Sequence, residues 1–274
     1  MKIDYSHITK SYQADGVKTF KEKDTVKSSK VQLLIEPKTA SLLVNFQKRK
    51  FSRTWDASQQ EESALSAFLK DSSKILEEFE LEFDSHNIPY LVVNHPEIWK
   101  KWLYYADLLN SKYSGEWVEK EIGLITHQIS DKNLFLKTLL NDFILNELYQ
   151  REIYKIPFDN KTGICNRKWI EPALGVALEF NQECKLQIRQ EEDTLRITGT
   201  VDLVKNKAEI KHLCIGRYFN PEDITSIEQK TVYTAQYITC IPNHINSVFS
   251  INGKNECLKQ TEINISIKEI RKNE

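Results

Sequence analysis

The chain has 274 residues, enough for one large domain or two small ones. Its 38 basic and 39 acidic residues leave a formal net charge of -1, so global charge does not indicate a nucleic-acid partner and any basic groove must be local. The five cysteines form no C-x-x-C pair, which argues against a zinc ribbon or a disulfide scaffold and favours buried thiols in a reducing compartment.

The amino-terminal half reads as an irregular start followed mostly by helices. Residues 1–30 are rich in Lys, Ser and Asp and weakly patterned, so we expect an irregular segment there. Beyond it we expect strands over 31–35 and 40–46, and helices over 58–79, 97–109 and 133–154. No signal peptide and no apolar run of about 18 residues is found, so we expect no membrane span.

The carboxyl-terminal half is richer in strands. A loop over 155–172 precedes expected strands over 185–189, 247–251 and 263–267, with a hairpin over 197–211 and a helix over 221–240 between them. This order predicts an α/β (α+β) fold with a central mixed β-sheet flanked by helices. We expect residues 31–274 to form a single domain, helix-rich over 55–155 and with its sheet core over 170–270.

The hairpin carries an acidic pair and a lysine. Side chains alternate along a strand, so Glu209 and Lys211 share a face. If Lys205-Asn206 is a two-residue turn, Asp202 falls opposite Glu209, with the two carboxylates about 5 Å apart. A divalent cation would relieve their repulsion. The alternative is an ordinary solvent-exposed hairpin, because this spacing also arises by chance.

A third carboxylate lies on the helix expected over 133–154. Glu147 falls three residues after Ile144 and four after Phe143, within the apolar stripe of that helix. It either lies at the edge of the stripe and reaches water or points into a metal site.

Several segments in order resemble one enzyme family. These are Gly199-Thr200-Val201-Asp202, Glu209-Ile210-Lys211, Tyr233-Thr234-Ala235-Gln236 and the run from Cys240 to Ile245. Over about residues 95–265 the chain resembles the DXO family of RNA 5′-end decapping exoribonucleases, within the PD-(D/E)XK nuclease superfamily. The resemblance implies a nuclease-like core and a nuclear or cytoplasmic enzyme.

The resemblance also implies a site. One or two Mg²⁺ or Mn²⁺ ions would be held by Glu147, Asp202, Glu209 and the backbone carbonyl of Ile210, with Glu179 as the alternative to Glu147. Asp202, Glu209, Lys211 and Gln236 would be the catalytic residues, Lys211 holding the nucleophile or a phosphate oxygen. Gln236 is equally well an ordinary helix-capping or surface amide.

The function implied is a metal-dependent phosphohydrolase acting on capped or triphosphorylated RNA 5′ ends, by decapping or pyrophosphate removal, with possible 5′→3′ exonuclease activity. Thr200 departs from the family pattern, which has an acid at this position. Two alternatives stay open: a RecB-like DNA exonuclease, and a catalytically weakened RNA-binding relative that acts as partner of a 5′→3′ exoribonuclease.

Overall fold

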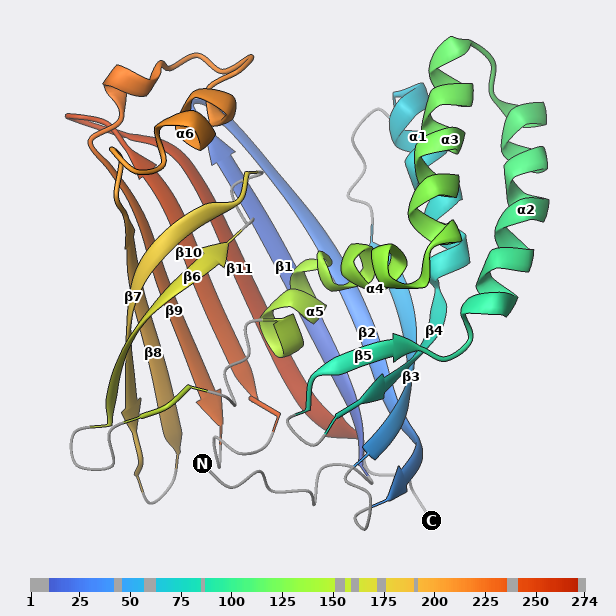
Figure 1. Ribbon diagram of the computed structural model, residues 1–274, viewed down its shortest axis with the longest axis horizontal. Coiled ribbons are helices and arrows are strands. Elements are labelled where there is room, and N and C mark those ends of the chain that lie inside the picture. The colour runs from blue at the N-terminus through green and yellow to red at the C-terminus, as the bar shows by residue number, and fades with distance from the viewer. Residues whose placement is uncertain are drawn as a thin grey trace. The chain divides into compact units, whose positions relative to one another are not determined.

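The computed structural model describes residues 10–41, 46–56, 63–84, 87–150, 156–158, 163–171, 176–189, 192–235 and 241–270. Its strands form an 11-stranded sheet in the order β5-β4-β3-β2-β1-β11-β10-β9-β8-β7-β6 (Figure 1). The chain divides into two compact units: a first unit of Met1–Asp15, Lys30–Tyr154 and Lys268–Glu274, and a second unit of Gly16–Ser29 and Lys155–Ile267.

The strands differ in length from four to 17 residues. They are β1 (Ser11–Glu22), β2 (Thr25–Ser41), β3 (Phe46–Asp56), β4 (Glu78–Phe83), β5 (Pro89–Val92), β6 (Ile164–Glu171), β7 (Leu178–Gln187), β8 (Asp193–Val201), β9 (Ser226–Ala235), β10 (His244–Asn252) and β11 (Cys257–Ile270).

The helices are short, apart from two. They are α1 (Ala64–Ser73), η2 (Lys74–Leu76), α2 (His95–Lys112), α3 (Glu116–Ser130), α4 (Lys132–Leu140), α5 (Phe143–Leu145), η3 (Asn146–Gln150), α6 (Lys207–Leu213) and η5 (Pro221–Asp223). All of them except α6 and η5 belong to the first unit.

In the first unit, β2 to β5 pair antiparallel and bury one face. The rings of Phe51 and Phe79 stack on that face with centroids 5.1 Å apart. Tyr149 of η3 packs on Phe83 with a centroid distance of 4.9 Å, so η3 covers this part of the sheet. Aromatic pairs of this kind supply much of the apolar area that a small core buries.

Two buried arginines join the same face to the segment that covers it. Arg49 donates to the hydroxyl oxygen of Tyr149 at 3.0 Å and to Gln47. Arg53 lies 3.4 Å from the carboxylate of Asp142, which also accepts from backbone amides at the start of α5. Because a buried cation is tolerated only when it is paired, these contacts fix where α5 and η3 lie on the sheet.

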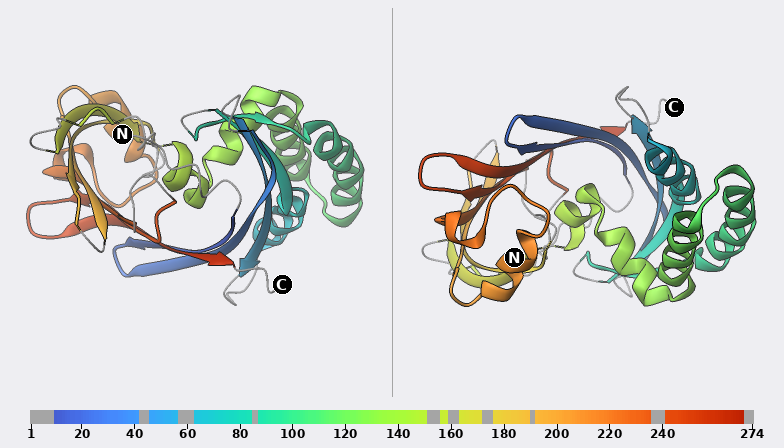
Figure 2. Two further views of the ribbon diagram at one scale, coloured as in Figure 1. Left: turned by 90° about the horizontal axis from the view of Figure 1, so that it is seen from below. Right: turned by 90° about the horizontal axis from the view of Figure 1, so that it is seen from above.

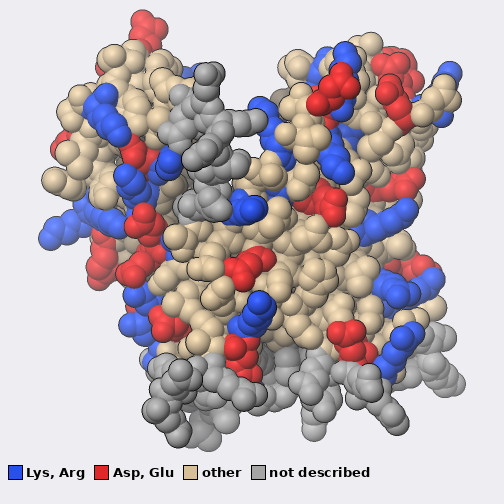
Figure 3. Space-filling view, turned by 180° about the vertical axis from the view of Figure 1, so that it is seen from behind, with Lys and Arg blue, Asp and Glu red and all other residues tan. Residues whose placement is uncertain are grey.

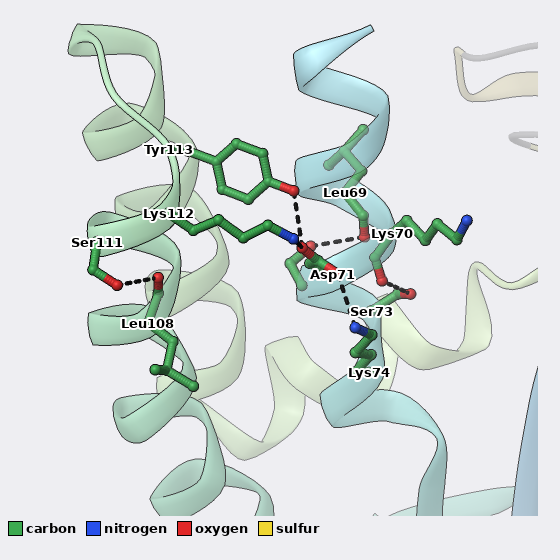
Figure 4. A network of polar contacts seen from close by, with 10 residues as sticks. Leu69, Lys70, Asp71, Ser73, Lys74, Leu108, Ser111, Lys112 and Tyr113 are labelled. Atoms are coloured by element: carbon green, nitrogen blue, oxygen red, sulfur yellow. Dashed lines mark hydrogen bonds and ion pairs between the residues drawn. The ribbon is translucent and has the colours of Figure 1, made fainter. Parts of the chain in front are cut away.

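A network centred on Asp71 ties α1 to α2 (Figure 4). Its carboxylate accepts from the hydroxyl group of Tyr113 at 2.8 Å and from the ammonium group of Lys74 at 2.9 Å, and Lys112 donates to it as well. These partners lower the pKa of Asp71 well below its ordinary value, the hydrogen bond from Lys112 being the largest cause. The charged form of Asp71 therefore stabilises the folded state.

In the second unit, β6 to β11 pair antiparallel in sequence order, and β11 has β1 as its other neighbour in the sheet. Buried and exposed positions alternate along β7, β8, β9 and β10. One side of this sheet is therefore a buried face and the other is exposed.

The predicted α/β fold with a central mixed sheet is wrong, because every strand pairing described is antiparallel and the sheet has 11 strands. The helix predicted over 221–240 is also wrong over 226–235, which is β9. The helix predicted over 58–79 is shorter and gives way to β4, and the one over 133–154 breaks into α4, α5 and η3.

Other elements agree with the sequence. The helix predicted over 97–109 is confirmed by α2, with Pro96 in its first turn. Strands predicted over 247–251 and 263–267 lie within β10 and β11. The irregular start predicted over 1–30 is wrong for 11–22 and 25–30, which belong to β1 and β2; residues 1–9 lie outside the described part. Tyr12, Ala14 and Gly16 are the alternating buried positions of β1, and only the first is a large apolar residue, so the strand pattern is weak in the sequence.

We expect Asp71→Asn to lower the free energy of unfolding by about 1 kcal/mol at pH 7, since its lysine partners are half-exposed and their attraction is screened. A carboxyl group with a lowered folded pKa stabilises above its unfolded pKa of about 4 and loses that effect as the pH falls, so the difference from wild type should shrink below pH ~4. Urea unfolding at several pH values measures it. Asp107→Asn, on the exposed side of α2, is the control and should change little; equal effects from the two variants contradict the network's role.

Candidate ligand-binding face

The predicted hairpin does not form. After β8 the chain turns at Asp202, whose carboxylate accepts from the amides of Val204 and Lys205 at 3.1 and 3.2 Å. The amide of Asn206 donates to the carbonyl oxygen of Asp202, and α6 begins directly afterwards. A side chain that bonds the backbone two and three residues on favours a turn over a continuing strand. Ala, Glu and Lys then favour a helix.

The acidic pair and the lysine are therefore placed differently from the prediction. Glu209 and Lys211 lie two positions apart on α6, a spacing at which helical side chains do not share a face. The register that put Asp202 opposite Glu209 is wrong, because residues 207–213 are not a strand. The carbonyl oxygen of Ile210 accepts from the amide of Cys214 at 3.2 Å within the helix end.

The remaining predicted site residues that the structure describes lie on other elements. Glu147 is fully buried on η3, so it does not reach water, and it belongs to the first unit whereas Asp202 belongs to the second. Glu179 lies on the exposed face of β7, 3.5 Å from Lys168. Gln236 lies outside the described residues. Within the described ranges no group of three or more His, Cys, Asp or Glu side chains is placed to hold a metal ion. The Mg²⁺ or Mn²⁺ ion therefore stays a prediction.

The buried side of the sheet in the second unit is the more informative surface. We call it the inner face; it is formed by alternate residues of β7 to β11. Its side chains are mostly apolar and nearly all are buried: Leu178, Phe180, Gln182, Cys184, Leu195, Ile197, Gly199, Val201, Ile227, Gln229, Thr231, Tyr233, Ala235, Ile245, Ser247, Phe249, Ile251, Lys259, Thr261, Ile263 and Ile265.

Gly199 leaves room for side chains from different strands of the inner face to contact one another. Phe180 of β7 and Phe249 of β10 are three strands apart, about 14 Å on a flat sheet. Their ring centroids are nevertheless only 6.3 Å apart. Gln182 and Gln229, which flank Gly199 in register, join above it by a hydrogen bond of 2.7 Å. The side chains thus converge over the glycine, which puts the inner face on the concave side of the strands. Figure 2 shows that these strands follow a curve.

A polar seam crosses this otherwise apolar surface. Arg167 of β6 donates to Gln182 at 2.8 Å, Gln182 donates to Gln229, and Gln229 donates to the hydroxyl oxygen of Thr231 at 3.1 Å. The guanidinium carbon of Arg167 lies 4.6 Å from the centre of the Trp169 ring. Linked buried polar groups strengthen one another where water is excluded.

The seam has two thiols beside it. Cys165 and Cys184 are direct partners on β6 and β7, and both are buried. Burial raises the pKa of the Cys184 thiol to about 11, so it stays protonated and chemically inert at neutral pH. The predicted buried thiols are confirmed for this pair, whereas Cys257 is exposed.

One end of the inner face is cationic. Lys259 of β11 is 3% exposed and is in register with Ile251 and Ile227. Its ammonium nitrogen lies 5.3 Å from the centre of the Phe20 ring. Burial, and then the charge of Arg217, lower the pKa of Lys259 to about 8.

The exposed side of the same sheet has a shallow depression of about 680 Å³. Its walls are two cross-strand rows of polar side chains: Asn166, Glu183, Thr198 and Lys230 on one side, and Lys168, Asn181, Thr200 and Glu228 on the other. Thr200, which stands where the DXO pattern has an acid, therefore faces away from the inner face. The walls combine two lysines with two glutamates, so the depression has no net charge.

No family model and no curated protein matches the chain. Lipovitellin, in a structure of its lipid–protein interactions, is similar with a TM-score of 0.40 and 9% identity over 96% of this chain and 25% of lipovitellin. The chain thus spans about a quarter of that protein.

Two further solved structures are similar. Rv2717c from M. tuberculosis has a TM-score of 0.26 and 6% identity, covering 97% of this chain and 94% of that one. A candidate outer membrane lipoprotein-sorting protein domain from Vibrio parahaemolyticus has a TM-score of 0.30 and 7% identity, covering 97% and 87%.

The resemblance to the DXO family is wrong, because the antiparallel sheet and the α6 helix replace the mixed sheet and the hairpin that carried it. The predicted RNA 5′-end processing is therefore also wrong. So are both nucleic-acid alternatives and the predicted RNA and exoribonuclease partners. On the face shown in Figure 3, Lys and Arg alternate with Asp and Glu over the described surface, without a continuous basic groove. No helix in the described ranges is long and apolar enough to span a membrane.

Sequence reasoning missed the inner-face residues. Gln229, Thr231 and Tyr233 alternate in the sequence with Lys230 and Val232, a period-two pattern typical of a strand. Because the inward residues Gln229 and Thr231 are polar, this pattern does not stand out as an alternation of apolar and polar residues. Lys259 follows Leu258 without any motif, so no local signal marks it as buried.

We expect Gly199→Ala to lower the free energy of unfolding by about 1–3 kcal/mol, the usual cost of overpacking. A Cβ atom there would lie 3.1 Å from both Gln229 Oε1 and Phe180 Cδ1. Urea unfolding measures the change. The control is Gly123→Ala in α3, where a Cβ atom meets nothing within 4 Å and helix propensity should raise stability. A Gly199→Ala protein as stable as wild type contradicts the convergence of side chains over this position.

We expect Lys259→Met to raise the free energy of unfolding by about 2 kcal/mol at pH 7, because it removes a buried charge. Lys259 has a folded pKa of about 8 against 10.5 in the unfolded chain. The penalty is complete below pH 8, and it fades as the pH rises towards 10.5 and the folded protein releases the proton first. The gain from Met should fade over the same range. Unfolding by urea at pH 7 and pH 10 tests this; a destabilised variant at pH 7 contradicts it.

Proposed function

We propose that the protein binds an apolar, lipid-like ligand on the inner face of its second unit. The observation that carries the proposal is a concave sheet surface that is apolar over most of its area and crossed by one polar seam. Sites for small molecules are concave, mostly apolar and equipped with a few placed polar groups.

The segment after β8 supports the proposal. In the described part of the second unit the one α-helix, α6, has seven residues and lies at one end of the strands (Figure 1). Ile210 and Leu213 of α6 and Phe219 and Ile224 of the following loop are buried. A short helix and a loop have few backbone bonds to break, so this end of the unit can open at less cost than a strand of the sheet.

The polar seam supports a ligand with a defined orientation. Gln182 and Gln229 each have a donor and an acceptor in their amide groups, and both are nearly fully buried. Apolar side chains of the same shape would stabilise the fold about as well, because buried polar groups contribute little net stability even when they are hydrogen-bonded. A ligand can therefore replace one hydrogen bond within the seam by a hydrogen bond of its own with little change in free energy.

The proposal is tested with unlabelled and photoreactive long-chain probes. The full-length protein is freed of bound lipid by mild organic extraction and refolding, and titrated with saturated chains of increasing length. Affinity should rise by about 0.8 kcal/mol per methylene group until the chain fills the face, and then level off. An affinity that never depends on chain length, or no binding at any length, contradicts the proposal.

Labelling then locates the probe. A diazirine at the end of the chain should label peptides containing inner-face residues of β8 to β10, and an excess of unlabelled chain should suppress that labelling. The exposed residues of the same strands, such as Thr198 and Lys230, serve as the internal control. Labelling confined to the exposed side places the ligand elsewhere and contradicts the proposal.

A further inference from the structure

The α6 segment, which we define as residues 202–217, exposes two large apolar side chains. Val204 precedes α6 and is 85% exposed, and Ile215 follows α6 and is 72% exposed. Among the large apolar residues that the structure describes, only Ile188, at 75%, is comparably exposed. Single apolar residues at a surface are normal, but two such residues in one short segment of the second unit indicate an interaction site.

Helical spacing places both side chains on one face of the segment. Backbone hydrogen bonds of helical type continue beyond α6, from the amide of Asn206 to the carbonyl oxygen of Asp202 and from the amide of Ile215 to that of His212. Residues four, three and four positions apart lie on one side of such turns. The outward stripe formed in this way consists of the exposed residues Val204, Ala208, Lys211 and Ile215. The buried residues of α6 lie on the opposite side.

Lysines surround the two apolar side chains of the outward stripe. Lys205 and Lys207 flank the stripe and Lys211 lies within it, and all three are exposed. Glu209 is the only carboxylate of α6. The carboxylate of Asp202 accepts from the amides at the start of the segment, so it is directed at the backbone. Positive charge therefore prevails around the stripe.

The turn between β1 and β2 extends this surface (Figure 1). Arg217, at the end of the α6 segment, forms an ion pair of 2.8 Å with Glu22, and the ring centre of Tyr218 lies 5.6 Å from the ammonium nitrogen of Lys23. The exposed charged and apolar residues of the turn are Lys21, Lys23, Asp24, Val26 and Lys27. Outside the ion pair, the two segments thus have more exposed lysines than exposed carboxylates.

We propose that this end of the second unit docks on an anionic lipid membrane. Val204 and Ile215 enter the boundary between headgroups and acyl chains, and the lysines contact the anionic headgroups. Segments that lie in a membrane interface combine an apolar stripe with lysines beside it. Lysine suits this place because its stem packs along apolar groups while its ammonium group stays among the headgroups.

The inference goes beyond the proposed function and is tested without it. The two nevertheless agree in one respect. An apolar ligand of the inner face is poorly soluble in water and gathers in membranes. The end of the unit that can open at least cost is the end that docks, so contact with the membrane gives the inner face access to its ligand.

Docking is measured by sedimentation of the full-length protein with vesicles. One set contains phosphatidylcholine alone, and the other also contains about 30% phosphatidylserine. The protein should bind the anionic vesicles at least about tenfold more tightly, because each lysine near an anionic surface strengthens binding about fivefold. Salt at about 0.5 M should remove most of this difference, since it screens the attraction.

A pair of isoleucine variants tests the apolar contact. Ile215→Ser should weaken binding to anionic vesicles at least about fivefold, and Val204→Ser added to it should weaken binding further. Ile188→Ser is the matched control and should leave binding unchanged, because Ile188 is as exposed but follows the end of β7 that lies away from α6. All of these side chains are exposed, so urea unfolding should show wild-type stability in each variant.

Two triple variants test the charges at equal net charge. Replacement of three lysines by Gln around the outward stripe should weaken binding to anionic vesicles at least about tenfold and change binding to phosphatidylcholine less than about twofold. The control replaces three exposed lysines of β6, β7 and β9 by Gln and should have little effect. The first set is Lys205, Lys207 and Lys211, and the control set is Lys168, Lys185 and Lys230.

The contrary outcomes are distinct. No binding to either vesicle overturns the docking, and so does equal weakening by Ile188→Ser and Ile215→Ser or by the two lysine sets. Self-association in sedimentation velocity that Ile215→Ser abolishes, without vesicle binding, assigns the stripe to a second copy of the chain and also overturns it. None of the substituted residues belongs to the inner face, so the chain-length titration of the proposed function stands or fails independently.

Discussion

The second unit depends on the hydrogen bond between Gln182 and Gln229, which passes over Gly199. Without a side chain at that position, two amides from strands on either side can meet, and Phe180 can lean toward Phe249. The absence of a Cβ atom at Gly199 thus leaves room for four side chains to come together on the concave side of the strands. The polar seam of the inner face depends on this close approach.

Stability and binding make opposite demands on the inner face. A sheet built only for stability would fill these positions with apolar side chains, because buried polar groups contribute little and buried charges cost free energy. Here Arg167 and the three seam residues occupy the middle, and Lys259 one end. The first unit shows the contrasting use of buried charge: Arg53 is paired with Asp142, and the pair fixes one segment to its sheet.

The sequence predicted elements whose apolar period agrees with their environment. Helix α2 and strands β10 and β11 were found because each has one buried side with mainly apolar residues. The sequence predicts a helix in place of strand β9 because the polar residues Gln229 and Thr231 occupy inward positions of the strand. The candidate site was predicted in the wrong place for a local reason: Asp202 bonds the amides that follow it, and this starts α6 where a strand was expected. Residues joined only by tertiary contacts, such as Arg217 and Glu22, leave no local pattern in the sequence.

Arg167 has a second consequence, which concerns solubility. Strand β6 is the last in the strand order, so one row of its backbone groups has no neighbouring strand within the described sheet. Such an edge invites another chain to add on, and proteins commonly prevent this by turning a charge inward at the edge. Arg167 points inward from β6, and Lys168 follows it on the other side. A strand arriving from another molecule would have to dehydrate both cations, which favours dispersed molecules over fibrils.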